Sequence, residues 1–209
     1  MIVTSLEDHT KGRKKVFLDG EYAFTLYSRE CKAYGIIEGQ VVAPEDLQLI
    51  REEVLPKRAK LRAMELLQKK TYTKAELAEK MRKGMTPEDC IAQAIAYVES
   101  YGYLDDKRYA RDYIFYKGRT RSRKRIEQDL MRKGIDKDVI NRAYDEVREE
   151  DHLPSAAELI RKELAKKHFD PEAATFEEKR KIMAYLYRKG FPSEEIRRAV
   201  NAGYDPDFE

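Results

Sequence analysis

The four residues RKGM at positions 82–85 recur as RKGI at 132–135 and as RKGF at 188–191. Basic residues in the last turn of a helix favour the negative end of the helix dipole, and glycine takes the left-handed conformation after a helix without a steric clash. Each segment, which we call a glycine corner, therefore predicts the end of one helix followed at once by another. The corner glycines are Gly84, Gly134 and Gly190.

Apolar residues recur at fixed positions after each corner. One follows the glycine directly, and a second lies six positions after the glycine, where it can pack against the first as a hydrophobic staple on the next helix. The second residues are Cys90, Ile140 and Ile196. Each corner is thus predicted to join two helices through a shared apolar contact.

A further helix is predicted upstream of each corner pair. Its three copies span residues 57–70, 106–117 and 155–168. Asp105 is the natural N-cap of the middle copy, and 73–76 and 175–178 have the sequence of capping boxes. The body of the chain is therefore predicted to consist of three tandem three-helix repeats, each with the outline of a helix-turn-helix module.

The first 43 residues have a different pattern. Alternating apolar residues at 16–18 and 22–26 flank a short turn and predict a β-hairpin. Such a small sheet is not stable alone, so we expect it to pack on a helix at 45–55 that Pro44 opens and Pro56 ends.

The predicted fold class is mainly α, with three helical repeats after a small N-terminal subdomain that contains a β-hairpin. The predicted divisions are 1–56 for the N-terminal subdomain and 57–103, 104–151 and 152–209 for the three repeats.

Composition excludes several classes of protein. The chain has 42 basic and 39 acidic residues among 209, a net charge of +3, and 42% hydrophobic residues, which is typical of a folded helical protein with charged faces. No apolar run is long enough to span a membrane or serve as a signal peptide. Cys31 and Cys90 have no metal or disulfide spacing. We therefore expect a cytoplasmic protein that has no bound metal or cofactor.

The densest positive charge lies in residues 117–125, which we call the basic segment; it holds six basic residues and no acidic one. Cations at a helix N-terminus oppose the helix dipole, so an external anionic partner is favoured over the alternative, a solvated loop. The candidate contacts for such an anionic partner, including phosphate, are Lys117, Arg119, Arg121, Arg123, Lys124, Arg125, Arg132 and Lys133.

Sequence-specific DNA reading is not favoured, because the helices after the corners carry many acidic residues that a DNA groove would repel. Catalysis has no support either. Asp105 and Asp106 are adjacent at a helix start and point in different directions, and no phosphate loop or catalytic triad is present. We expect no catalytic residues.

Several segments resemble the bacterial RecX family of regulatory proteins. They are YGYLDDKRYA at 101–110, RI at 125–126, LMRKGI at 130–135 and LYRKGF at 186–191, with TKAEL at 73–77 and LDGEYAF at 18–24. Two features depart from the family pattern: a long polar link at 168–175, and Lys80, which stands where the first repeat is expected to have an apolar residue.

The resemblance implies a non-enzymatic modulator of the RecA recombinase that acts in DNA repair, recombination and the SOS response. Such a protein lies in the groove of the RecA filament on single-stranded DNA and suppresses strand exchange, ATP turnover and coprotease activity. The expected partner is therefore RecA, with weak or indirect DNA contact that is not sequence-specific, no membrane contact, and a monomeric chain. The alternatives are a freestanding nucleic-acid-binding regulator of helix-turn-helix type and an enzyme acting on nucleic acid.

Overall fold

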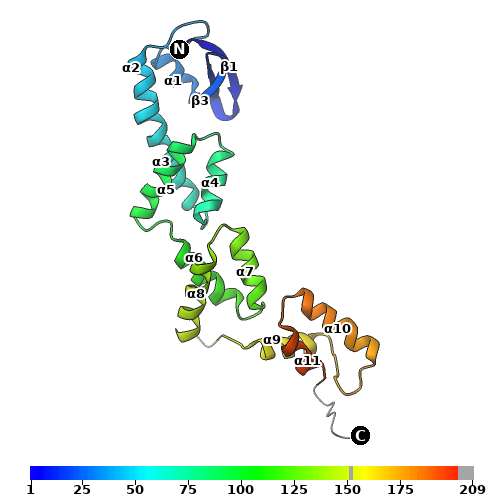
Figure 1. The fold of residues 1–209 in the computed structure, drawn as a ribbon. Helices are drawn as coiled ribbons and strands as arrows, with labels where there is room; N and C mark the ends of the chain where they lie inside the picture. The colour runs from blue at the N-terminus through cyan, green and yellow to red at the C-terminus, as the bar shows by residue number, and fades with distance from the viewer. Residues whose placement is uncertain (151–152, 202–209) are drawn as a thin grey trace. The chain divides into compact units, whose positions relative to one another are not determined.

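The computed structural model describes residues 1–150 and 153–201. The chain forms two compact units, Met1–Asp105 and Asp106–Glu209. The described part is mainly helical and begins with a three-stranded antiparallel sheet, which confirms the predicted fold class (Figure 1).

The N-terminal sheet contains the predicted hairpin. Its strands are β1 (Val3–His9), β2 (Arg13–Leu18) and β3 (Glu21–Tyr27), in the order β1-β2-β3. Val16 pairs with Phe24 across the hairpin, and both side chains are buried. The turn residues Asp19 and Gly20 have φ values of 50° and 91°, so a conformation that suits glycine closes the hairpin.

The helix after the sheet continues through Pro56, so the prediction that Pro56 ends it is wrong. After the short helix α1 (Ser28–Ala33), helix α2 (Pro44–Leu49) runs through a π-helical turn (Ile50–Val54) directly into α3 (Leu55–Leu67). The backbone N–H of Leu55 donates to the carbonyl of Ile50, five residues earlier. This widened turn relieves the clash between a proline ring and the carbonyl of the fourth residue before it.

The predicted order of helix, helix, glycine corner, helix holds in all three repeats. The helices are α3, α4 (Lys74–Arg82) and α5 (Glu88–Ser100) in repeat 1, α6 (Asp106–Lys117), α7 (Arg123–Arg132) and α8 (Lys137–Glu150) in repeat 2, and α9 (Ala156–Lys166), α10 (Phe176–Arg188) and α11 (Ser193–Val200) in repeat 3. The capping boxes at Thr73 and Thr175 form as predicted, and a third one forms at Ser155. Asp105 directly precedes α6, and its capping bond stays a prediction.

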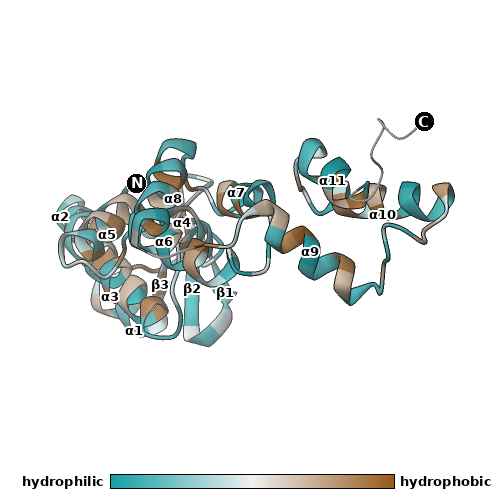
Figure 2. Cartoon of the chain, turned by 90° about the horizontal axis from the view of Figure 1, so that it is seen from below, coloured by the Kyte–Doolittle hydropathy of each residue, from teal (hydrophilic) through white to brown (hydrophobic). Residues whose placement is uncertain are grey.

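Each repeat buries one apolar face, but the cores are arranged differently. The sheet and repeat 1 share a single cluster that includes Val16, Phe24, Ile50, Ala63 and Leu77. Repeat 2 and repeat 3 each bury a separate, smaller cluster. In Figure 2, individual helices carry both hydrophobic and hydrophilic residues, as amphipathic packing requires. The four-part division at residues 56, 103 and 151 stays a prediction, and its last boundary lies outside the described residues.

Two of the three corner glycines adopt the expected conformation. Gly134 and Gly190 have φ values of 80° and 84°. In repeat 2, the N–H of Ile135 donates to the carbonyl of Leu130 at 3.1 Å and that of Gly134 to the carbonyl of Met131 at 2.9 Å, which is the Schellman pattern.

The expectation for Gly84 is wrong, because Met85 takes the left-handed conformation, with φ 60°. The same Schellman bonds occur one residue later, from Thr86 to Met81 at 3.2 Å and from Met85 to Arg82 at 2.9 Å. In every corner the left-handed residue lies four positions after a buried apolar residue, here Met81. Packing of that residue, and not the position of the glycine, sets the end of the helix. Met81 therefore takes the structural place of Leu130 in repeat 2.

Candidate functional site

The basic segment joins two helices of repeat 2, as predicted. Helix α6 ends at Lys117 and α7 begins at Arg123, so residues 118–122 form the link. Ser122 caps α7, since its hydroxyl accepts a hydrogen bond from the backbone N–H of Arg125 at 3.3 Å. A Cβ atom at Gly118 would lie 2.6 Å from the carbonyl oxygen of Ile114, so only glycine fits at this tight exit from α6.

Three of the eight candidate cations surround a buried carboxylate, that of Asp129, which is 7% exposed. The guanidinium of Arg121 lies 2.7 Å from Oδ2, that of Arg125 lies 3.5 Å from Oδ1, and Arg132 also contacts Oδ1. The hydroxyl of Tyr113 donates to Oδ2 at 3.2 Å. These cations therefore have a structural role inside repeat 2.

The carboxylate of Asp129 is held in its charged form. Burial alone raises its pKa, but the hydrogen bonds from Arg132 and Tyr113 and the charge of Arg125 outweigh burial and place the pKa below its usual value. A buried carboxylate is costly unless it is paired. Removing these arginines therefore destabilises the fold and also lowers the positive charge of the surface. Sequence reasoning missed Asp129; its place three residues after the apolar Ile126, on the inward face of α7, is the signal that identifies it.

Two further candidates also make contacts within the repeat. Arg123 pairs with Glu127 at 2.7 Å, donates to the side chain of Asn141 at 3.1 Å, and lies 4.5 Å from the ring centroid of Tyr144. The ammonium group of Lys133 lies 5.5 Å from the ring centroid of Tyr109. These contacts hold the first turn of α7 against α8 and the corner against α6.

The remaining three candidates, Lys117, Arg119 and Lys124, are exposed. Arg119 lies over the ring of Phe115 at 5.0 Å, and Lys124 lies over the ring of Tyr187 at 5.8 Å. Within the part of the chain that the structure describes, no carboxylate lies within ion-pair distance of any of the three. These three are therefore the cations of the basic segment that remain available to an external anion.

The helices that follow the corners present acidic side chains to solvent. Exposed acidic residues are Glu88 and Asp89 on α5, Asp138, Asp145, Glu146 and Glu149 on α8, and Glu194 on α11. In a DNA-reading helix-turn-helix, the equivalent helix enters the major groove, where carboxylates meet phosphate repulsion. The repeats therefore have the helix order of a DNA-reading module, but the helix that would enter the groove presents acidic side chains.

Comparison with known proteins assigns the family. The description "RecX, second three-helix domain" matches residues 105–143, and "RecX, third three-helix domain" matches residues 156–200. A regulatory protein RecX from Caldanaerobacter subterraneus subsp. tengcongensis is 30% identical over 203 residues, which cover 96% of this chain and 99% of the relative. The chain belongs to the RecX family.

Further RecX proteins agree with this assignment. One from Chromobacterium violaceum is 32% identical over 152 residues, covering 73% of this chain and 95% of the relative. A crystal structure of regulatory protein RecX superposes with a TM-score of 0.62 at 21% identity, covering 96% and 98% of the two chains. RecX from Lactobacillus salivarius gives 0.57 at 21% identity, over 71% of this chain and 96% of that one. The expected family and its regulatory, non-enzymatic character are confirmed.

A second buried carboxylate in this RecX-family chain, Glu163 on α9, was also missed from the sequence. It is 5% exposed, accepts a hydrogen bond from the hydroxyl of Tyr185 at 2.8 Å, and contacts Lys166 at 3.0 Å and Lys189. Burial raises its pKa, but the hydrogen bonds from Lys189, Lys166 and Tyr185 outweigh burial and lower the pKa to about 2. Repeat 3 therefore also contains a charged carboxylate in its interior.

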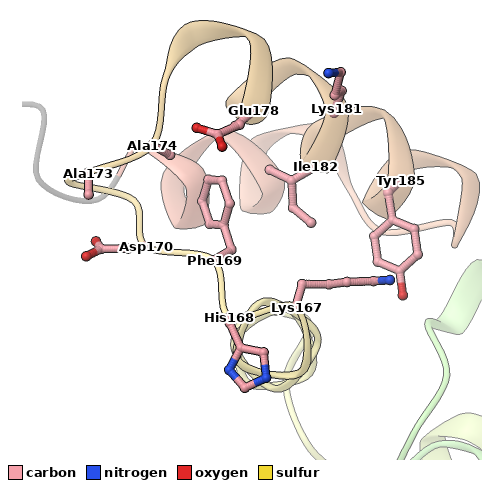
Figure 3. Close-up of a pocket in the computed structure, with 10 residues that line it drawn as sticks. All are labelled: Lys167, His168, Phe169, Asp170, Ala173, Ala174, Glu178, Lys181, Ile182 and Tyr185. Atoms are coloured by element: carbon pink, nitrogen blue, oxygen red, sulfur yellow. The ribbon is translucent and has the colours of Figure 1, made fainter.

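Among the described residues we find a hollow in repeat 3 and no cluster of metal-ligating side chains. A hollow of about 460 Å³ lies in repeat 3, between the end of α9 and α10. Figure 3 shows Phe169, Ile182 and Tyr185 in its lining beside charged groups of both signs. Among residues 1–149 and 153–201, no cluster of three or more His, Cys, Asp or Glu residues has the geometry of a metal site. No helix of the same described part is long and apolar enough to cross a membrane.

Proposed function

We propose that this chain binds the RecA filament on single-stranded DNA and lowers its recombinase, ATPase and coprotease activities. Membership of the RecX family supports the proposal most strongly. The modular helical body supports it as well, because separate small cores suit a protein that contacts repeating subunits one repeat at a time.

Within this proposal, the basic segment of repeat 2 faces the filament. Between residues 117 and 133 the chain has eight basic and two acidic residues, so the surface stays positive after the internal pairs are counted. Lys117, Arg119 and Lys124 make the external contacts, either to acidic protein side chains or to the DNA backbone. Arg121, Arg125 and Arg132 hold Asp129 and contribute to the positive potential.

The test is a triple variant, Lys117→Ala with Arg119→Ala and Lys124→Ala, assayed for inhibition of RecA ATP hydrolysis on single-stranded DNA. Because three charged contacts are lost, we expect half-inhibition to require about ten-fold more protein, and the difference to shrink as salt is raised. The matched control removes three exposed cations elsewhere in the same compact unit: Lys137→Ala, Arg142→Ala and Arg180→Ala. Equal inhibition by both triple variants contradicts this placement of the interface.

A competition experiment distinguishes this proposal from the alternative, a freestanding nucleic-acid-binding regulator. If bare duplex DNA binds the wild-type chain as tightly as RecA-coated single-stranded DNA at physiological salt, the filament is not the preferred partner. The exposed acidic residues on α8, such as Asp145 and Glu146, favour the filament, since they repel a bare duplex.

A further inference from the structure

A basic cleft of about 520 Å³ lies between the N-terminal sheet and repeat 1, within the first compact unit. Its lining residues come from the β1–β2 link, β2, β3, α1, α3, α4 and the corner at 84–87, in the sheet and first repeat drawn in Figure 1. Its basic lining residues are Lys11, Arg13, Arg29, Arg58, Arg62 and Lys80, and its acidic ones are Glu30 and Glu65.

The two acidic residues are already paired inside the cleft. Arg58 lies 3.2 Å from Glu30, and both side chains are mostly buried, at 24% and 18% exposed. Arg62 lies 3.0 Å from Glu65. Neither carboxylate is therefore available to neutralise the rest of the lining.

Four cations of the cleft remain without an acidic partner. In the described ranges 1–149 and 153–201, no carboxylate lies within ion-pair distance of Lys11, Arg13, Arg29 or Lys80. Arg13 instead donates to backbone and hydroxyl oxygens, among them the carbonyl of Gly84 at 3.5 Å. The cleft thus has an excess of positive charge around a floor that contains the buried apolar residues Leu55, Ala59 and Met81.

The position of Lys80 corresponds to the internal polar link of the other repeats. In repeat 2 the linked residues directly precede buried Ile114 and Leu130, and in repeat 3 they precede buried Leu164 and Leu186. Because Met81 takes the place of Leu130, the equivalent residue in α4 is Lys80, which precedes Met81. In α3 the buried residues near the helix end are Ala63 and Leu66, and the residues that precede them, Arg62 and Glu65, already pair with each other.

Repeat 1 therefore has a lysine, Lys80, where the second helix of repeat 2 has Asp129 and that of repeat 3 has Tyr185. An external carboxylate beside Lys80 would supply the charged acceptor that the other two repeats contain internally. The lining gives no support for base stacking. Its aromatic residue, Tyr27, already makes cation–π contacts with the guanidinium groups of Arg58 and Arg29, which lie 4.7 Å and 5.7 Å from its ring centroid. Phosphate chains with exposed bases are thus disfavoured relative to carboxylate side chains.

We propose that this cleft binds an acidic peptide segment of a partner protein, with Asp or Glu side chains against Lys80, Arg29 and Lys11 and an apolar side chain over the Leu55 and Met81 floor. Exposed Leu61, at 49% exposure, extends this apolar surface at the mouth of the cleft. The proposal does not depend on the basic segment, which belongs to the other compact unit.

The test measures binding of a fluorescein-labelled peptide made of Asp, Glu and Leu to the full chain by fluorescence anisotropy at physiological salt. We expect the wild type to bind it, Lys80→Gln to weaken binding, and Lys80→Glu to weaken it about ten-fold or more, because a charged contact is first lost and then becomes repulsive. The matched control is Lys69→Glu, which makes the same charge change on an exposed residue outside the cleft.

The outcomes separate clearly. Equal binding by Lys80→Glu and Lys69→Glu, or no peptide binding by the wild type, overturns the proposal. A peptide with Asn and Gln in place of Asp and Glu should not bind. If labelled oligo(dT) binds more tightly than the acidic peptide and is lost on Lys80→Glu, the cleft binds nucleic acid and the peptide assignment is wrong. Circular dichroism of each variant checks that the helices are intact.

Discussion

In repeats 2 and 3 a hydrogen bond from a tyrosine hydroxyl to a carboxylate joins the first two helices, but the tyrosine lies on a different helix in each repeat. In repeat 2 the tyrosine, Tyr113, is on the first helix and the carboxylate, Asp129, on the second. In repeat 3 the carboxylate, Glu163, is on the first helix and the tyrosine, Tyr185, on the second. In these two repeats the contact therefore consists of one donor and one charged acceptor, and either helix can supply either group.

This contact occurs where the apolar core is small. Repeats 2 and 3 each bury a separate cluster, whereas repeat 1 shares a larger one with the sheet and has no such bond. A buried carboxylate is stabilising only when it is fully paired, and both carboxylates are surrounded by cations from the corner or from the neighbouring turn. The polar link thus supplements a limited hydrophobic core.

Neutralising Glu163 is the largest expected perturbation of this comparison. Its folded pKa of about 2 lies below the usual 4.5, so the stability it contributes is present above about pH 4.5 and is lost as pH falls toward 2. We expect Glu163→Gln to destabilise repeat 3 by about 2 kcal/mol at pH 7, a value reduced from the full linkage energy because its lysine partners are partly exposed. Hydrogen exchange localised to α9 and α10, followed from pH 7 to pH 3, measures the effect.

The matched variant for repeat 2 is Asp129→Asn. The pKa of Asp129 is also lowered, so its contribution has the same sign and is lost as pH falls below about 3.8. Protection should fall in α6 and α7 for this variant and in α9 and α10 for Glu163→Gln. If either variant keeps wild-type protection and wild-type acid sensitivity, its carboxylate does not stabilise the repeat.

The corners of repeats 3 and 1 provide the next test. Gly190 has φ 84°, and a Cβ there would lie 2.9 Å from the hydroxyl oxygen of Ser122, which itself donates to the carbonyl of Lys189 at 2.6 Å. Gly190→Ala combines backbone strain with this clash, and we expect a loss of about 2 kcal/mol in the free energy of unfolding by urea.

Gly84→Ala is the control for that variant, because Gly84 does not have a positive φ. Its Cβ would lie 3.1 Å from the carbonyl oxygen of Met81, so a small adjustment is needed and the expected loss is below about 1 kcal/mol. An equal loss at both glycines would mean that left-handed geometry does not distinguish the two corners.

The contrast between Gly84 and Gly190 marks how far local sequence determines this fold. Capping boxes at Thr73 and Thr175 and the helix of 106–117 depend on neighbours in sequence, and these were predicted from it. The end of α4 depends on burial of Met81, and the continuation through Pro56 depends on a π-helical turn; both follow from tertiary packing, which no short pattern contains.

The candidate site was predicted only in part for the same reason. The position of the basic segment between two helices follows from local charge and periodicity. The pairing of Arg121, Arg125 and Arg132 with Asp129 depends on which face of α7 is buried. Similarly, Glu163 is paired by Lys189, 26 residues away, so sequence spacing does not reveal that it is buried and charged.

The smallest expected effect comes from removing the tyrosine hydroxyls and leaving both carboxylates in place. Tyr185→Phe and Tyr113→Phe each remove one hydrogen bond to a charged acceptor, which contributes about 1 kcal/mol when the cationic partners remain. Tyr113→Phe also removes the bond that this hydroxyl accepts from Arg121 at 3.3 Å, but Arg121 keeps its charged partner. Tyr185 donates at 2.8 Å and Tyr113 at 3.2 Å, so the loss should be larger in repeat 3. In repeat 2, Arg121 lies 2.7 Å from the same carboxylate oxygen and compensates for the missing hydroxyl. Local hydrogen exchange in each variant measures the two losses, and a larger loss for Tyr113→Phe would mean that the arginines around Asp129 depend on that hydroxyl for their positions.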